Sequence, residues 1–127
     1  MFMVTEPQLM NETFARAFNS RRIENMLSLY EPEAILLVDG SGCDLVGLPA
    51  IAEEFTRLLA APGTMVSLNN FCVCRGDIAL LRADFALRDG ERVIASGSTA
   101  EVIRRQNDGS WLYLIDHTVG ASLPSVT

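Results

Sequence analysis

Three carboxylates lie inside segments of the chain that otherwise have the pattern of β-strands. Asp84, Glu101 and Asp116 all fall in the last third of the 127 residues, in runs rich in apolar side chains. A carboxylate in a strand either faces water or points into a lined cavity. In an apolar cavity its pKa rises, and such a carboxyl group can donate or accept a proton near neutral pH. The strands that hold these side chains therefore decide whether the chain has an acid–base site.

Two other residues could also carry protons. Asp39 lies in the Gly- and Ser-rich segment 39–42, where we interpret it as a turn aspartate that bonds the backbone, with a base at a cavity mouth as the alternative. His117 is the only histidine and follows Asp116. Strict alternation puts these two side chains on opposite faces, which favours a packed or interfacial histidine over a catalytic one.

The cysteines do not indicate a disulfide or a metal site. Their number is three, and Cys72 and Cys74 share one strand face. We interpret them as small hydrophobic side chains of the core. A zinc site takes about four ligands, and the chain has one histidine and no C-x-x-C motif. We expect no metal and no cofactor.

The carboxylates are carried by an expected antiparallel meander that begins at residue 64. Segment 78–88 alternates and ends at Asp89-Gly90, a strong hairpin signal. A second strand-like segment, 91–105, ends at the turn 107–109, and a third, 110–120, completes the sheet.

Apolar residues at helical spacing predict three helices before this meander. The first follows Pro7 and ends at residues 19–20. The second carries an apolar stripe that Tyr30 completes, and it ends before Pro32. The third begins at residues 47–49 and ends at 62–63, after a short buried strand over 34–38. We interpret Tyr30 as a core residue whose hydroxyl could reach a cavity.

Length and charge limit the classes of function. A chain of 127 residues, 49% of them hydrophobic, is one domain over residues 1–127 with a substantial core. The net charge of −6 argues against nucleic acid as a partner, since phosphate binding needs a basic patch. No uncharged apolar run approaches the roughly 20 residues of a membrane span. The first residues do not resemble a signal peptide, so we expect a cytoplasmic protein without membrane contact.

These elements predict an α+β fold. Three amphipathic helices followed by an antiparallel sheet must bury their apolar stripes on one sheet face. Twisted strands curl around such a helical layer into a cone. We therefore expect a curved antiparallel sheet with three N-terminal helices on its concave face, and a cavity between the two layers that suits a small molecule.

Several short segments also resemble a known family. They are Leu29–Ala34 (LYEPEA), Val46-Gly47 with Ile51, Glu101–Trp111 (EVIRRQNDGSW) and Ile115-Asp116-His117. Over about residues 9–119 the chain resembles the nuclear transport factor 2-like superfamily, and within it the SnoaL-like and ketosteroid-isomerase-like proteins. The resemblance implies the cone-shaped α+β fold. The isomerases use an aspartate base with an oxyanion hole made by a tyrosine and a protonated aspartate. Aligned on Tyr30 and Gly47, those positions fall at Val38, Phe14 and Glu101, so only the second acid is retained.

The same alignment predicts a different set of cavity residues. Even-numbered positions on the strands over 80–86 and 112–118 should face the cavity, which gives Arg82 and Asp84, and then Leu112, Leu114, Asp116 and Thr118. The expected catalytic residues are Asp116 as base or acid, Arg82 as the stabiliser of oxyanion charge, and Glu101 or Asp84 as a second proton carrier. Phe14, Tyr30, Phe55 and Leu114 are the expected substrate-binding walls. The structural alternatives are an ion pair of Asp116 with an arginine, an Arg82–Asp84 pair along the strand, and solvated carboxylates.

Together these observations favour a small-molecule-binding protein. If it is an enzyme, it is expected to carry out cofactor-free isomerisation, dehydration or cyclisation of an apolar carbonyl compound. The alternative is a non-catalytic ligand-binding or dimerisation module. A homodimer is expected in either case, because odd-numbered strand positions form an apolar sheet face without a helical cover. These positions are Leu81, Phe85, Leu87, Trp111, Tyr113 and Ile115.

Overall fold

Helices come first in the chain and strands dominate the rest, as the sequence patterns predict. The computed structural model describes residues 2–38 and 44–122. The helical elements are a short 3₁₀ turn (Pro7–Leu9), α1 (Met10–Asn19), α2 (Ile23–Leu27) and α3 (Leu48–Leu59). The strands are β1 (Tyr30–Leu37), β2 (Asp44–Val46), β3 (Thr64–Arg75), β4 (Ile78–Asp89), β5 (Arg92–Ser98), β6 (Ala100–Arg105) and β7 (Trp111–His117).

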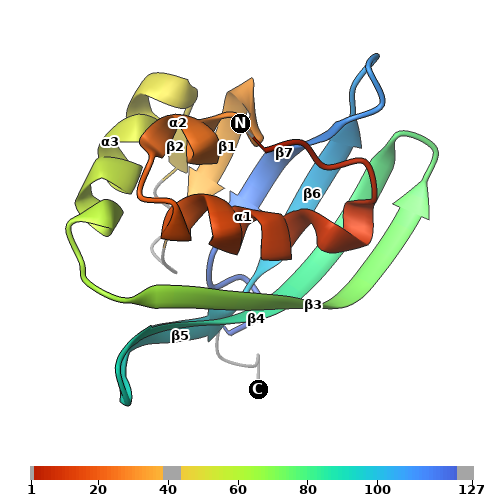
Figure 1. The fold of residues 1–127 in the computed structure, drawn as a ribbon. Coiled ribbons are helices and arrows are strands. Elements are labelled where there is room, and N and C mark those ends of the chain that lie inside the picture. Colours follow the sequence, from red (N-terminus) through yellow and green to blue (C-terminus); the bar gives the residue numbers. More distant parts are fainter. Residues whose placement is uncertain (1, 39–43, 123–127) are drawn as a thin grey trace.

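The strands form one curved sheet in the order β2-β1-β7-β6-β4-β3, and β5 pairs with β4. Figure 1 shows α1 running across the sheet in front of β6 and β7, while α2 and α3 lie over its β1–β2 end. The predicted α+β architecture with helices on the concave face is confirmed. Among the described strands one pair, β1 with β7, is parallel rather than antiparallel. No hairpin links these two strands, so turn geometry does not dictate their relative direction.

The starting points of α1 and α3 follow from the local sequence. Pro7 lies in the first turn before α1, where its missing N–H costs nothing. Pro49 is the second residue of α3, whose N-cap is Gly47 with a φ of 87° that suits glycine. Ile51 and Phe55 then recur at a spacing of four and are buried under the sheet.

The second helix is shorter than predicted. It ends at Leu27, and Tyr30 begins β1 instead of completing a helical stripe. The Tyr113 N–H donates to the carbonyl of Leu29 at 2.8 Å, so pairing with β7 takes over these residues. Pro32 lies where the β1–β7 register shifts, between Tyr30 and Ile35. Tertiary strand pairing thus overrides the local helical spacing.

A β-bulge in β7 changes which side chains face the helices. Ile115 pairs with Val102, and Tyr113 pairs with Ile103, which leaves Leu114 as an extra residue. Side chains on either side of the bulge therefore reach the same face. Trp111 and Tyr113 are buried in the core, on the same face as Asp116.

The predicted faces of β4 were wrong. Leu81 and Leu87 are buried under the helices, and Phe85 is half-buried on the same side. Arg82 and Asp84 are exposed on the opposite face. The apolar side chains of β4 gain by burial and its charged side chains by hydration. This difference decides which face of the strand packs against the helices, because one face must enter the core. Of the residues expected on the uncovered face, Ile115 alone lies there clearly, with 37% of its surface exposed.

Two smaller points complete the fold. Cys74 is exposed and Cys72 half-buried, so the interpretation of the cysteines as buried core residues fails for Cys74. Within residues 2–38 and 44–122, none of the helices combines the length and the apolar composition that crossing a membrane requires.

Candidate functional site

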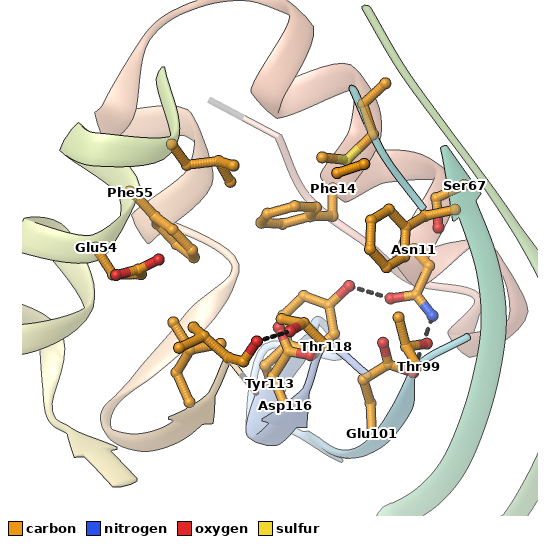
Figure 2. Close-up of a pocket in the computed structure, with 16 residues that line it drawn as sticks. Asn11, Phe14, Glu54, Phe55, Ser67, Thr99, Glu101, Tyr113, Asp116 and Thr118 are labelled. Carbon is orange, nitrogen blue, oxygen red and sulfur yellow. Dashed lines mark hydrogen bonds between the residues drawn. The ribbon is translucent and has the colours of Figure 1, made fainter. Parts of the chain in front are cut away.

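A cavity of about 200 Å³ lies between the helices and the concave face of the sheet (Figure 2). Side chains from the surrounding helices and strands line the cavity, and the majority of them are apolar or aromatic. The lining residues are Asn11, Phe14, Leu36, Val38, Glu54, Phe55, Leu58, Met65, Ser67, Phe85, Ala95, Thr99, Glu101, Tyr113, Asp116 and Thr118.

Two buried carboxyl groups lie next to each other in this cavity. Glu101 on β6 and Asp116 on β7 are direct cross-strand partners, and they are only 3% and 6% exposed. Side chains in such a position are about 5 Å apart at Cβ. Two of the carboxylates that the sequence analysis singled out are therefore brought together.

The pKa of both carboxyl groups is raised. Burial raises the pKa of Glu101 to about 8, with a further contribution from the charge of Asp116, while Thr99 and Asn11 act in the opposite direction. Burial also raises the pKa of Asp116 to about 6, against the hydrogen bond from Tyr30 that lowers it. Two carboxyl groups this close ionise one after the other rather than together, because the first negative charge disfavours the second.

Neutral donors orient the two acids. The Tyr30 hydroxyl donates to Oδ2 of Asp116. The Asn11 amide donates to Oε1 of Glu101 at 3.1 Å. The Tyr113 hydroxyl donates to Oδ1 of Asn11, so α1, β6 and β7 are joined by one chain of hydrogen bonds (Figure 2).

An aromatic cluster forms the wall that faces the acids. The ring of Phe14 on α1 lies 6.2 Å from Tyr30, 5.7 Å from Phe55 and 6.1 Å from Tyr113, between centroids. Phe14 and Phe55 line the cavity, as predicted. Helical spacing put both on buried helix faces, and the cavity lies directly beneath those faces.

Tyr30 and Leu114, the other two expected wall residues, do not line the cavity. Tyr30 is 3% exposed and acts through its hydrogen bond to Asp116 from behind the wall. Leu114 is the extra residue of the β7 bulge. Because alternation is broken there, its even number no longer directs it inward.

Arg82 and Asp84 do not belong to the cavity, and their expected roles there are withdrawn. Both are exposed on the outer sheet face. Hydrogen bonds from Ser98 and Asn70 lower the pKa of Asp84, as expected for a hydrated carboxylate with donors nearby. Among the described residues Asp116 forms no ion pair with an arginine, whereas Glu31 pairs with Arg104.

Sequence reasoning missed Asn11, Tyr113 and Thr99. Asn11 lies three positions before Phe14 and seven before Phe18 on α1, so its place on the buried helix face was the available signal. Tyr113 was assigned to the outer face because the bulge at Leu114 was not recognised. Thr99 is buried between β5 and β6, where its hydroxyl accepts from the Ala83 N–H at 3.0 Å.

The remaining chemical candidates stay outside the site. His117 is half-buried, and its Nδ1 has no hydrogen-bond partner among the described residues. Asp39 lies outside the described residues. Within the part of the chain that the structure describes, no three His, Cys, Asp or Glu side chains gather as metal ligands would.

Comparison with known proteins identifies the fold. No family model matches the sequence, and no curated protein matches it. A ketosteroid isomerase-like protein from Erwinia carotovora atroseptica superposes with a TM-score of 0.69 at 19% identity, over 85% of this chain and 88% of that one.

Two further structures agree with this comparison. An NTF-2-like protein of unknown function from Shewanella oneidensis gives a TM-score of 0.71 at 12% identity, over 85% of this chain and 91% of that one. A Nostoc punctiforme protein of unknown function with a cystatin-like fold gives 0.71 at 19%, over 94% and 92%. The chain therefore has the NTF2-like, or cystatin-like, fold, and at these identities the likeness shows the fold alone.

Proposed function

We propose that this protein binds a small apolar carbonyl compound in its cavity and moves a proton on it without a cofactor. One observation carries the proposal: Glu101 and Asp116 are buried side by side on the cavity wall, with their pKa values on either side of 7. A carboxylate base and a carboxylic acid are then available together at neutral pH. Acid–base pairs whose environments separate their pKa values are typical of proton-transfer sites.

Each acid has a role that its environment supports. The Asp116 carboxylate removes a proton from the carbon next to the substrate carbonyl. Protonated Glu101 donates a hydrogen bond to the carbonyl oxygen, which stabilises the negative charge that develops there. Where the substrate has a double bond between its β and γ carbons, Asp116 then returns the proton to the γ carbon as the double bond moves into conjugation with the carbonyl, which completes an isomerisation. Loss of a hydroxyl group or attack on a second carbonyl would give dehydration or cyclisation instead.

The catalytic step can be tested by hydrogen exchange in D₂O. We expect the protein to accelerate deuterium uptake at the carbon between ring and carbonyl of 1-phenyl-2-propanone, followed by proton NMR. Asp116→Asn should slow this exchange about 100-fold, the usual scale for a general base. Asp84→Asn is the matched control on the outer face and should keep the wild-type rate.

A non-catalytic module is the second candidate. It would bind the same ketone without accelerating exchange, and that result would exclude the catalytic role while leaving the binding role. The observation that favours such a module is on the other side of the sheet, where apolar side chains form a continuous row.

This outer apolar row supports a homodimer, which we propose as the assembly in either case. Its members are paired one to the next across six strands: Val46, Ile35, Ile115, Val102, Leu80 and Val73. Val46, Leu80 and Val73 are 54%, 48% and 53% exposed. At about 4.8 Å between strands the row is roughly 24 Å wide, which suits the about 800 Å² per partner of a stable interface.

Charges beside the row favour a second copy as the partner. Exposed Glu33 and Asp44 lie at its β1–β2 end, whereas exposed Arg75 and Arg82 outnumber Asp84 at its β3–β4 end. A two-fold axis parallel to the strands would place the acidic end of one copy over the basic end of the other. The same operation lays one row on the other.

A further inference from the structure

We propose that the compound bound in the cavity carries a protonated amine on an apolar body of about one ring. The inference rests on the proposed function, since it names the class of molecule that this cavity would take. The carbonyl substrate would then be an amino ketone or amino aldehyde.

Among the described residues that line the cavity, the charged side chains are acids and none is a base. Its ionisable lining groups are Glu54, Glu101, Asp116 and the Tyr113 hydroxyl. The chain has no lysine, and all ten arginines are exposed. The other segments around the acids present uncharged side chains: Asn11 and Phe14 from α1, Leu36 from β1 and Val38 just after it, Met65 and Ser67 from β3, Phe85 from β4, and Ala95 from β5.

Glu54 already has a partner, whereas the other two acids do not have a cationic one. Glu54 on α3 pairs with Arg57 one turn along the same helix. Glu101 and Asp116 have only neutral donors among the described residues, namely Asn11 and Thr99 for Glu101 and Tyr30 for Asp116. A buried carboxylate without a cation is unfavourable, because its charge has lost most of its hydration. A ligand ammonium group would supply the missing positive charge.

The apolar part of the cavity suits the rest of such a molecule. The rings of Phe14, Phe55, Phe85 and Tyr113 line the cavity that the acids share. Aromatic faces attract ammonium groups when water is excluded. A dry cavity of about 150 Å³ accepts benzene, so one of about 200 Å³ has room for a ring with a short amine-bearing arm.

The opposite ligand charge is disfavoured by the same arrangement. A carboxylate or phosphate ligand would meet the negative charge of the acid pair with no arginine or lysine to offset it. A neutral ligand avoids this repulsion but leaves the buried charge without compensation. The expected order of affinity is therefore amine, then ketone, then carboxylate.

Three probes of similar size test this order on the full chain. They are 2-phenylethylamine, 1-phenyl-2-propanone and phenylacetate, measured by isothermal titration calorimetry at pH 7. We expect the amine to bind at least about tenfold more tightly than the ketone, and phenylacetate more weakly than both. The ammonium group should pair with the Asp116 carboxylate while Glu101 keeps its proton for the carbonyl oxygen, so at pH 7 the measured heat should depend little on the ionisation enthalpy of the buffer.

The pH dependence has a definite sign. Raising the pH from 5 to 8 ionises the two acids while the amine stays protonated, so amine affinity should rise and ketone affinity should not. The double variant Glu101→Gln/Asp116→Asn should lose the preference for the amine and keep ketone binding. Glu53→Gln, on the exposed side of α3, is the control and should keep the preference.

The outcomes separate this inference from the proposed function. Ketone binding as tight as amine binding, or amine affinity that falls from pH 5 to pH 8, overturns the inference and leaves the proposed function intact. If none of the three probes binds at millimolar concentration, both are overturned. Binding of the three probes to the wild-type protein decides between these outcomes. The result therefore does not depend on how well the double variant folds.

Discussion

The two buried acids link the chemistry of this protein to its stability. Glu101 and Asp116 are held by Asn11 and Tyr30, which are neutral donors that orient a carboxyl group without neutralising its charge. Burial therefore raises the pKa of each acid. A group that binds its proton more tightly in the folded than in the unfolded chain makes folding less favourable as the pH rises.

Replacing Glu101 should stabilise the protein at high pH. In the unfolded chain Glu101 titrates at its ordinary pKa of 4.5, and in the folded chain near 8, so wild-type stability should fall as the pH rises through this window. Glu101→Gln keeps an acceptor for Asn11 and removes the ionisation. We expect similar free energies of unfolding at pH 4, and a variant more stable than wild type by on the order of 3 kcal/mol at pH 8.5.

Urea unfolding of both proteins across this pH range measures the difference. Glu53→Gln controls for the loss of one negative charge from an acidic chain, and its difference from wild type should be small at every pH. A Glu101→Gln variant that is less stable than wild type at pH 8.5 would contradict a raised pKa.

Removing the Tyr30 hydroxyl should raise the pKa of Asp116 further. This hydroxyl donates to the Asp116 carboxylate and lowers its pKa, against the effect of burial. In Tyr30→Phe the burial effect remains and the donor is lost. Carbon-13 NMR of the side-chain carboxyl should then show Asp116 titrating above its wild-type value of about 6.

Tyr113→Phe is the matched control for that experiment. Tyr113 is also a buried aromatic donor, but its hydroxyl donates to Asn11 and not to a carboxylate. The Asp116 titration should change less than in Tyr30→Phe. Equal shifts in the two variants would mean that loss of a buried hydroxyl, and not the specific bond, controls Asp116.

At the scale of elements, irregular positions determine which side chains meet. The bulge at Leu114 lets Tyr113 and Asp116 share the concave face, although they are three residues apart. Gly63, between α3 and β3, has a φ of 115° and passes close to β4. The Arg21 guanidinium donates to its carbonyl and to that of Ala61, which fixes this connection under the helices.

Gly63→Ala should therefore destabilise the fold strongly. A Cβ at this position would lie 2.5 Å from the carbonyl oxygen of Arg88, which is backbone and has little freedom to move. We expect a loss of roughly 3 kcal/mol or more in the free energy of unfolding. Gly76 is the control, because it has a φ of 59° and a Cβ added there would meet no atom within 4 Å.

Gly76→Ala should cost only about 1 kcal/mol, the penalty for a left-handed conformation. Chemical unfolding of the two variants beside wild type gives both values. Equal losses of stability in the two variants would show that the backbone conformation alone, and not contact with Arg88, makes glycine necessary at position 63.

At the scale of the whole molecule, the sheet separates two surfaces of different character. Its concave face and the helices enclose the cavity, while its outer face carries the outer apolar row. Exposed apolar side chains are ordinary when single. Here they are aligned strand by strand over the width of the sheet, which is typical of an interaction surface.

A charge in the middle of this row should prevent dimerisation. Light scattering at micromolar concentration should give twice the chain mass for wild type and the 13.9 kDa of a single chain for Leu80→Asp. Leu80 is 48% exposed, so the substitution should leave the fold intact, as checked by circular dichroism. Val93→Asp on β5, which lies off the row, is the control and should stay dimeric. A wild-type monomer would rule out the dimer.

The sequence by itself determined the fold class, the succession of helices before strands, and four members of the site: Phe14, Phe55, Glu101 and Asp116. Periodicity depends on neighbours within a few residues, so α1, α3 and the strand runs were readable. Glu101 and Asp116 stood out because charges are rare in apolar strands. The predicted direction of each was correct, and their chemical roles remain predictions.

Only the tertiary structure decided which faces meet. Tyr30 is in a strand because β7 pairs with it, and Tyr113 faces the cavity because a bulge breaks alternation. Arg82 and Asp84 point outward because the apolar side chains of β4 have the helices to pack against. The two-residue period of a β-strand means that neighbouring side chains point to opposite faces. It does not decide which of the two faces is buried. That choice depends on contacts between residues far apart in the chain.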